Sequence, residues 1–215
     1  SLTFSSNESL IIDSIFVNIA GENVTTLESE NIYISNYTIN GNEPGGYISY
    51  LLNYQDLAGN QGIQIDSTLD SSYVIHDLIP PEIINCYISS NNSDSSWAKE
   101  GDSVYVTFFS SEPLNNINIE IANVSADYTQ KNPTKYIGYL FMNNDFEQEE
   151  LSFMITYTDL GGIPGDTIIN TTNSSRVKFD NEAPFINNVL MKTNNIYSDT
   201  LAGIGTIDTL SFSIS

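Results

Sequence analysis

The sequence predicts an all-β chain built from tandem sandwich domains, and three observations carry that prediction. Two stretches of one pattern, YQDLAGNQG at residues 54–62 and YTDLGGIPG at residues 157–165, lie 103 residues apart. Apolar and polar residues alternate over many short segments, which is the period of a β-strand. Asn, Ser, Gly and Pro separate these segments, and no stretch has the period of a helix. A repeat of this length predicts domains of about a hundred residues each.

The alternation is clearest between two similar proline-containing junctions at residues 77–83 and 180–186. We expect strands at residues 83–88, 104–108, 117–121, 136–141, 151–157, 167–169 and 177–179. About seven short strands in about a hundred residues is the profile of an immunoglobulin-like β-sandwich. The acidic segment 145–150 is expected to be a loop or at most one helical turn.

The repeat divides the chain into three predicted domains. Residues 1–79 match the central domain without its first strand, residues 80–181 form a complete domain, and residues 182–215 supply the opening strands of a third. An isolated sandwich that lacks an edge strand exposes an unpaired ladder. Either sequence upstream of residue 1 or another chain would supply the missing strand, and we favour the first source. We therefore expect this chain to be a segment of a longer one.

The charge balance excludes several kinds of partner. The formal net charge is −21, from 6 Lys+Arg against 27 Asp+Glu, and none of the basic residues precedes Lys99. Nucleic-acid backbones and anionic membranes bind clustered cations, so neither is an expected partner. No apolar run approaches the roughly 20 residues of a membrane span, so no direct membrane insertion of this segment is expected. An acidic coat that keeps an exposed protein soluble is the simplest explanation.

Cys86 is the single cysteine, which excludes an intrachain disulfide and a thiolate metal cluster. Its apolar surroundings predict a small buried hydrophobe within a strand.

Two longer motifs resemble a known family. Residues 98–114 read AKEGDSVYVTFFSSEPL, and residues 54–60 read YQDLAGN. They resemble the A-K-x-G-D-x-V-x-V-x-F-x-x-S-E-P-L and Y-x-D-x-A-G-N segments of immunoglobulin-like repeats in large bacterial and archaeal surface and secreted proteins. The resemblance covers essentially the whole chain, and it implies an array of β-sandwiches outside the cell or at its surface. Partners would be other copies of the chain or neighbouring domains, and no single ligand is implied.

The second copy of the shorter motif departs from the family pattern. Gly161 stands where the first copy has Ala58, and Ile163 stands where it has Asn60. The role of the Asn in the first copy is therefore in doubt in the second.

Asp56 and Asp159 admit two interpretations. An Asp followed three residues later by Gly caps a tight turn, because its carboxylate accepts backbone N–H groups and Gly adopts positive φ. The alternative is calcium, which takes six to eight oxygen ligands. The candidate ligands are Asp56, Asp77 and Glu8 near the first junction, and Asp159, Asp180, Glu182 and Glu112 near the second. Residues 180–185 also resemble the acidic calcium linker of cadherins. Such a site would stiffen a joint and relieve carboxylate repulsion.

Sequons of the type N-x-S/T are frequent. They begin at Asn7, Asn23, Asn36, Asn91, Asn123, Asn170 and Asn173. A chain this rich in Asn, Ser and Thr would have roughly five by chance. The sequons are thus compatible with a surface glycoprotein.

No catalytic set is expected, and we predict that the chain is not an enzyme. The lone His76 is replaced by Phe179 in the second copy, and the carboxylates lie in turns that recur from copy to copy. Trp97 could belong to a sugar-binding platform, but packing at the edge of a sandwich is the simpler expectation.

These observations predict a structural segment of an extracellular multi-domain rod, such as a cell-surface filament, a surface layer or an adhesin stalk. The alternative is an adhesive module that recognises a glycan or a partner protein and is stiffened by calcium. The only hint of a one-domain aromatic patch is Phe108-Phe109, where the first domain has Phe4-Ser5.

Overall fold

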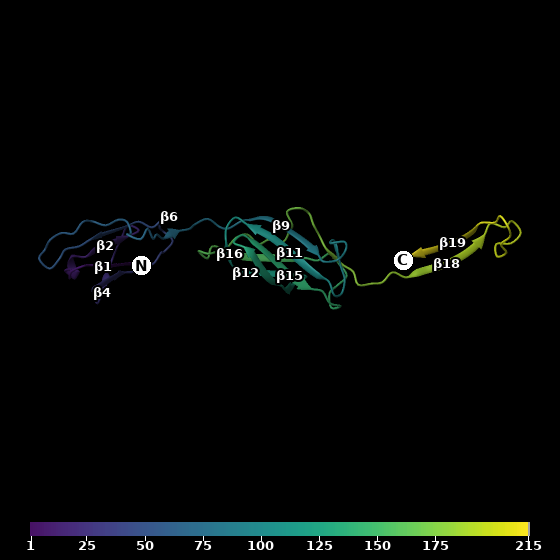
Figure 1. Cartoon of the computed structure of the whole chain (residues 1–215), viewed down its shortest axis with the longest axis horizontal. Coiled ribbons are helices and arrows are strands. Elements are labelled where there is room, and N and C mark those ends of the chain that lie inside the picture. Colours follow the sequence, from purple (N-terminus) through teal and green to yellow (C-terminus); the bar gives the residue numbers. More distant parts are fainter. Residues whose placement is uncertain (215) are drawn as a thin grey trace. The chain divides into compact units, whose positions relative to one another are not determined.

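The computed structural model describes residues 1–214, and its regular structure is β throughout apart from one 3-10 turn at Ile12–Ser14 (Figure 1). The all-β prediction is therefore confirmed. The chain divides into two compact units. The first unit is Ser1–Pro81 with Thr158–Gly165, and the second unit is Glu82–Tyr157 with Asp166–Ser215. Ser215, the last residue of the predicted third domain, lies outside the described residues. None of the described segments is a helix of the length and apolarity that crossing a membrane requires.

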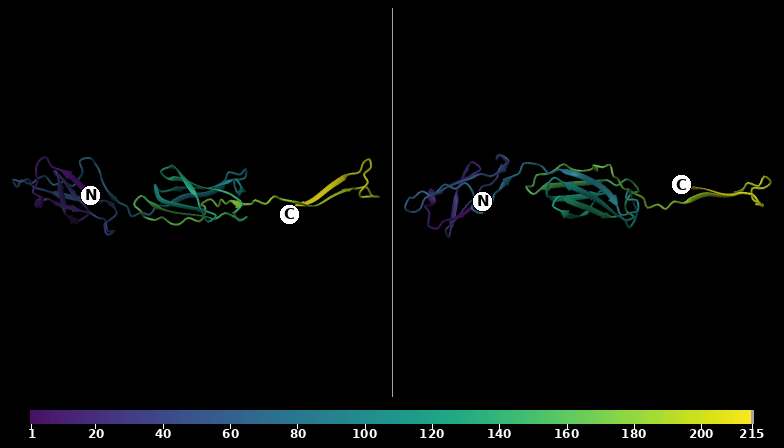
Figure 2. Two further views of the ribbon diagram at one scale, coloured as in Figure 1. Left: turned by 90° about the horizontal axis from the view of Figure 1, so that it is seen from below. Right: turned by 45° about the horizontal axis from the view of Figure 1, so that its top comes forward.

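The second unit holds two antiparallel sheets that face each other across one apolar core. The larger has the strand order β14-β15-β11-β9. Its strands are β9 (Ile83–Ser90), β11 (Ser103–Ser110), β14 (Asp127–Asn132) and β15 (Lys135–Phe141). The smaller has the order β13-β12-β16. Its strands are β12 (Leu114–Ile121), β13 (Val124–Ser125) and β16 (Phe153–Asp159). The arrangement is β-sandwich-like, and Figure 2 shows it from two further directions.

The core of the second unit follows the predicted alternation. Val104, Val106 and Phe108 of β11 are fully buried, and so are Ile121 of β12 and Ile155 of β16. The residues between them are more exposed, apart from a few such as Thr107. A short parallel pair, β10 (Trp97–Ala98) with β17 (Lys178–Phe179), lies beside the sandwich.

The first unit has three small antiparallel sheets. Their strand orders are β1-β5-β4, β3-β2-β7 and β6-β8. The strands are β1 (Leu2–Ser5), β2 (Phe16–Ile19), β3 (Glu22–Val24), β4 (Thr26–Ser29), β5 (Ile32–Ser35), β6 (Gly46–Tyr47), β7 (Tyr50–Asn53) and β8 (Ile75–His76). The buried members of its core cluster are Val17, Ile19 and Leu52. Strand β1 ends its sheet, so one of its edges has no partner strand among the described residues.

A separate two-stranded sheet closes the described chain. Strands β18 (Ile186–Thr193) and β19 (Asp208–Ile214) pair antiparallel, with a bulge between Asn187 and Leu190. Its large apolar side chains are exposed, including Val189, Met191 and Phe212.

Two parts of the second unit differ from the sequence-based expectation. The predicted strand at 167–169 is a single bridge, in which Ile168 pairs with Ile155. The structure also has β13 and β14, which no apolar alternation predicted, because their side chains are mostly polar and exposed. The segment 145–150 is non-helical, as expected.

Candidate functional site

The Asp56 turn shows what the Asp-x-x-Gly motif does. Its Oδ1 accepts hydrogen bonds from the backbone N–H of Ala58 at 2.9 Å and of Asn60 at 2.8 Å. Its Oδ2 accepts the Asn60 side-chain amide at 2.7 Å. Gly59 has a φ of +85°, which the turn requires. The hydrogen bond from the Asn60 side chain is the main cause that lowers the pKa of Asp56. The predicted turn cap is confirmed here.

The Asp159 turn has a similar geometry with fewer hydrogen bonds to the carboxylate. Asp159 Oδ1 accepts the backbone N–H of Ile163 at 2.8 Å, and Gly162 has a φ of +89°. Asp159 is only 1% exposed, and its Oδ2 has no hydrogen-bond partner. The reason is the change from Asn to Ile at position 163, because an Ile side chain has no donor. A buried carboxylate oxygen without a hydrogen bond destabilises the fold, because no protein contact compensates the loss of its water.

A second carboxylate lies beside Asp159 in the same unit. Oxygens of Asp77 and Asp159 lie within 4.8 Å of each other. Asp77 Oδ1 also accepts the backbone N–H of Ile79 at 3.0 Å. Two carboxylates this close repel each other, and a hard cation that binds both would relieve the repulsion. The structure thus brings together one residue from each predicted calcium set.

Asp180, Glu182 and Glu8 take other positions. Asp180 Oδ1 accepts the backbone N–H of Glu182 at 3.0 Å, and Glu182 and Glu8 are exposed. Glu112 is half-buried in the turn before β12, and its carbonyl accepts the Ser110 hydroxyl. Within residues 1–214, no group of three potential metal ligands includes Glu8, Asp56, Asp180 or Glu182.

A groove of about 1050 Å³ opens in the first unit. It is lined by residues 1–7, which include β1, and by residues 65–74. Ile19, Tyr50 and Leu52 also line it. We call this feature the first-unit groove. The sequence predicted that the first domain lacks its first strand. It did not predict that residues 1–7 and residues 65–74 line a groove.

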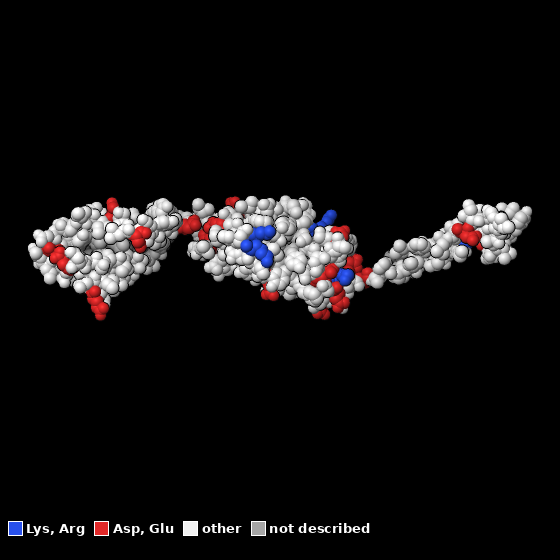
Figure 3. All heavy atoms as spheres, viewed as in Figure 1, with Lys and Arg blue, Asp and Glu red and all other residues white. Residues whose placement is uncertain are grey.

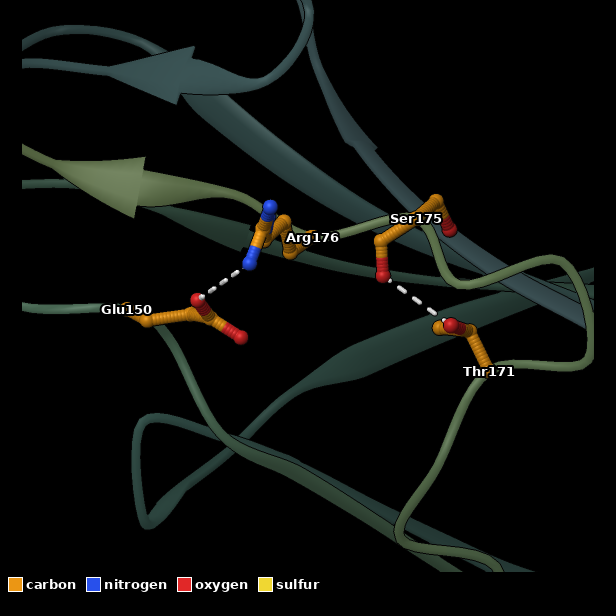
Figure 4. A network of polar contacts seen from close by, with 4 residues as sticks. All are labelled: Glu150, Thr171, Ser175 and Arg176. Carbon is orange, nitrogen blue, oxygen red and sulfur yellow. Dashed lines mark hydrogen bonds and ion pairs between the residues drawn. The ribbon is translucent and has the colours of Figure 1, made fainter.

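Surface charge follows the composition. Figure 3 shows acidic side chains scattered over the face in view, with few basic ones. The one ion pair among the described residues joins Arg176 Nη1 to Glu150 Oε2 at 3.7 Å (Figure 4). Both side chains are largely exposed, so the pair contributes little to stability.

The other residues that the sequence singled out lie as follows. Cys86 is fully buried, and burial raises the pKa of its thiol to about 12, which confirms a small buried hydrophobe. Trp97 is partly exposed in β10, with Lys178 Nζ 5.1 Å from its ring centre. His76 pairs through β8 with β6. Phe108 is buried, and Lys135 Nζ lies 5.2 Å from the ring centre of Phe109.

The sequon asparagines are all exposed. They are Asn7, Asn23, Asn36, Asn91, Asn123, Asn170 and Asn173. Asn91 Oδ1 also accepts the backbone N–H of Ser103 at 2.8 Å.

Comparison with protein-family models finds no match for this chain. Comparison with curated proteins finds no match either. The functional argument therefore depends on the residues and contacts described above.

Proposed function

We propose that this chain is a structural segment of an extracellular protein built of tandem immunoglobulin-like β-sandwiches, as in a cell-surface filament, a surface layer or an adhesin stalk. One observation carries the proposal: the two units contain the same core contact. Phe4 stacks on Tyr33 with ring centres 5.2 Å apart, and Phe108 stacks on Tyr136 at 5.3 Å.

The hydrogen bonds of these tyrosines repeat as well. The Tyr33 hydroxyl accepts the backbone N–H of Leu10, and the Tyr136 hydroxyl accepts that of Leu114. Shared packing at sequence offsets of 103 and 104 residues is what repetition of a folding unit produces. Repeated sandwiches provide length and a displayed surface, because each folds around its own core.

The charge and the sequons of the chain support a location outside the cell. The net charge of the chain is strongly acidic, and its seven sequon asparagines are exposed. Immunogold labelling of intact cells of the source organism, with antibodies raised against this chain, tests the proposal. Label on the outside of unpermeabilised cells is expected, and label that needs permeabilisation would contradict it.

The surroundings of Asp159 favour the binding of calcium to this segment. Its Oδ2 is buried without a partner, and the Asp77 carboxylate lies within 4.8 Å. Ca²⁺ bound to these oxygens would satisfy Asp159 and neutralise the pair, with backbone carbonyls and water as its further ligands. Asp56 offers no such oxygen, because Asn60 already bonds its Oδ2.

A further inference from the structure

We propose that the outer face of the larger sheet in the second unit binds an uncharged glycan. This function goes beyond the proposed structural one, because a segment that only provides length needs no ligand-binding face.

The outer face is defined by three neighbouring strands, which Figure 1 labels β9, β11 and β15. Cys86, Val106 and Tyr136, one from each strand, are buried in the core between the two sheets. The side chains that alternate with these residues point to the opposite side of the sheet. Five of them are aromatic, and we call them the aromatic face: Tyr87, Tyr105, Phe109, Tyr139 and Phe141.

Strand pairing makes the aromatic face one continuous layer. Tyr105 of β11 lies directly opposite Tyr139 of β15. In the middle of the face, Thr107 lies between Ile137 on one side and Tyr87 on the other. Thr107 is only 5% exposed, because the larger side chains beside it cover it. The rings therefore belong to one packed surface and not to separate patches.

The aromatic face is open to solvent and long enough for several sugar rings. Tyr139 is 37% exposed and Phe141 is 63% exposed, and the other three rings are partly exposed. Between Lys135 and Phe141, β15 extends over about 20 Å. The face is thus matched in length to an oligosaccharide and not to a single monosaccharide.

The chemistry of the face suits a sugar ring. The C–H groups on the faces of a pyranose pack on aromatic rings, whose π-faces are negative. The tyrosine hydroxyls can both donate and accept hydrogen bonds, as sugar hydroxyls do. Further polar side chains lie beside the rings, since Asn85 is opposite Phe109 and Ser89 is opposite Tyr105.

The fold itself does not require this aromatic face, because the first unit has polar residues at corresponding positions. The stacked pairs align the two units, with Phe4 matching Phe108 and Tyr33 matching Tyr136. Counted from these pairs, the counterparts of Phe109, Tyr139 and Phe141 are Ser5, Asn36 and Thr38. A sandwich of this kind therefore forms its sheet without these rings.

Charge selects an uncharged glycan as the occupant. Lys135 lies opposite Phe109 and Asp127 lies opposite Tyr139, so the charges beside the aromatic face are of opposite sign. The chain as a whole has a net charge of −21, which repels a second copy and keeps such chains apart. The same charge repels an acidic glycan. An uncharged glycan meets neither repulsion.

Affinity electrophoresis of the full chain tests the proposal. Native gels are cast without polysaccharide, with the uncharged polysaccharides mannan, dextran or hydroxyethyl cellulose, and with anionic polygalacturonate. The native chain is expected to be retarded by at least one uncharged polysaccharide and not by polygalacturonate. A chain that no uncharged polysaccharide retards would overturn the proposal, and so would retardation by polygalacturonate alone.

The double variant Tyr139→Asn/Phe141→Thr tests whether the aromatic face is the site. It introduces the residues that the first unit has at these positions and leaves the net charge unchanged, so its mobility in a gel without polysaccharide is expected to match that of the native chain. Its retardation is expected to disappear. Both side chains are exposed, so its melting temperature is expected to stay near the native value, and a melting curve verifies that it is folded.

Tyr128→Asn is the matched control. Tyr128 is 44% exposed on the neighbouring strand β14, but it lies opposite Gly138 and so belongs to the other face of the sheet. This variant is expected to be retarded like the native chain. Equal retardation of a folded double variant and the native chain would overturn the site, as would equal loss in both variants.

Light scattering after size exclusion separates a glycan from a second copy as the occupant. The native chain is expected to keep its single-chain mass of 23.8 kDa at every concentration. A native dimer that Tyr139→Asn/Phe141→Thr dissociates would assign the aromatic face to a second copy and overturn the proposal. These outcomes leave the surface labelling described above intact, so the two proposals fail separately.

Discussion

The hydroxyl of Tyr136 accepts a hydrogen bond of 2.8 Å from the backbone N–H of Leu114, 22 residues earlier in the chain. The Tyr33 hydroxyl accepts the N–H of Leu10 at 3.3 Å in the same way. Both tyrosines are almost fully buried, at 1% and 0% exposure. In each unit, the hydroxyl of one buried tyrosine thus holds the backbone of Leu10 or Leu114 against the core.

Tyr136→Phe tests this contact. The change leaves the Leu114 N–H buried without an acceptor, and such a loss costs about 1–3 kcal/mol of unfolding free energy. Urea denaturation measures it. Tyr139→Phe is the control, because Tyr139 is 37% exposed, and it is expected to change little. Equal, small effects of the two variants would contradict a stabilising role for the Tyr136 hydroxyl.

Ile163→Asn restores the donor that the second Asp turn lacks. In the first turn Asn60 Nδ2 reaches Asp56 Oδ2 at 2.7 Å, so an Asn at 163 is expected to reach Asp159 Oδ2. Satisfying this buried oxygen is expected to add about 1 kcal/mol of stability in metal-free buffer. Ile163→Leu supplies no donor and serves as the control. If Ile163→Leu stabilises the chain as much as Ile163→Asn, the gain in stability comes from packing and not from the new hydrogen bond.

The calcium proposal predicts a melting temperature that depends on the metal. Ca²⁺ at a hundred times its Kd adds about 2.7 kcal/mol of stability, and a chelator removes it. Asp159→Asn is expected to abolish the effect, whereas Asp56→Asn keeps it. Identical melting curves of the native chain with Ca²⁺ and with chelator would exclude the site.

Stability in acid depends on Glu43 and Tyr37. The Tyr37 hydroxyl, which hydrogen-bonds the Glu43 carboxylate, is the main cause that lowers the pKa of Glu43 from 4.5 to about 2. Because the folded pKa is the lower one, this stabilisation is complete above pH 4.5 and is lost as the pH falls toward 2.

Tyr37→Phe therefore raises the pKa of Glu43 toward its ordinary value and reduces the loss of stability in that pH range. Carboxyl titration by NMR measures the pKa directly. Tyr47→Phe, at a residue that is 72% exposed, is the control. A Glu43 pKa that stays near 2 in Tyr37→Phe would refute the explanation.

The sequence predicted the core strands because their side chains alternate. Val104, Val106 and Phe108 are buried as expected, since β11 has the core on one face. Strand β14 was missed because its residues, DYTQKN, are polar and it lies at the edge of its sheet. The strand expected at 167–169 is reduced to one bridge, because only Ile168 pairs with β16.

The site was less accessible to sequence reasoning. The Asp turns followed from the glycine three residues after each Asp, because that spacing is local. The approach of Asp77 to Asp159 depends on tertiary structure, since the two residues are far apart in the chain. No sequence pattern indicates the Tyr37–Glu43 hydrogen bond, because a Tyr and a Glu six residues apart are common.

Differential scanning calorimetry of the dilute full chain tests most directly whether the two units have separate cores. We predict two transitions, with the second unit melting at the higher temperature because its buried cluster is larger. Leu52→Ala is expected to destabilise the lower transition by about 2–5 kcal/mol and leave the upper one unchanged, and Ile155→Ala is expected to do the reverse. A single transition that both substitutions shift equally would contradict the account.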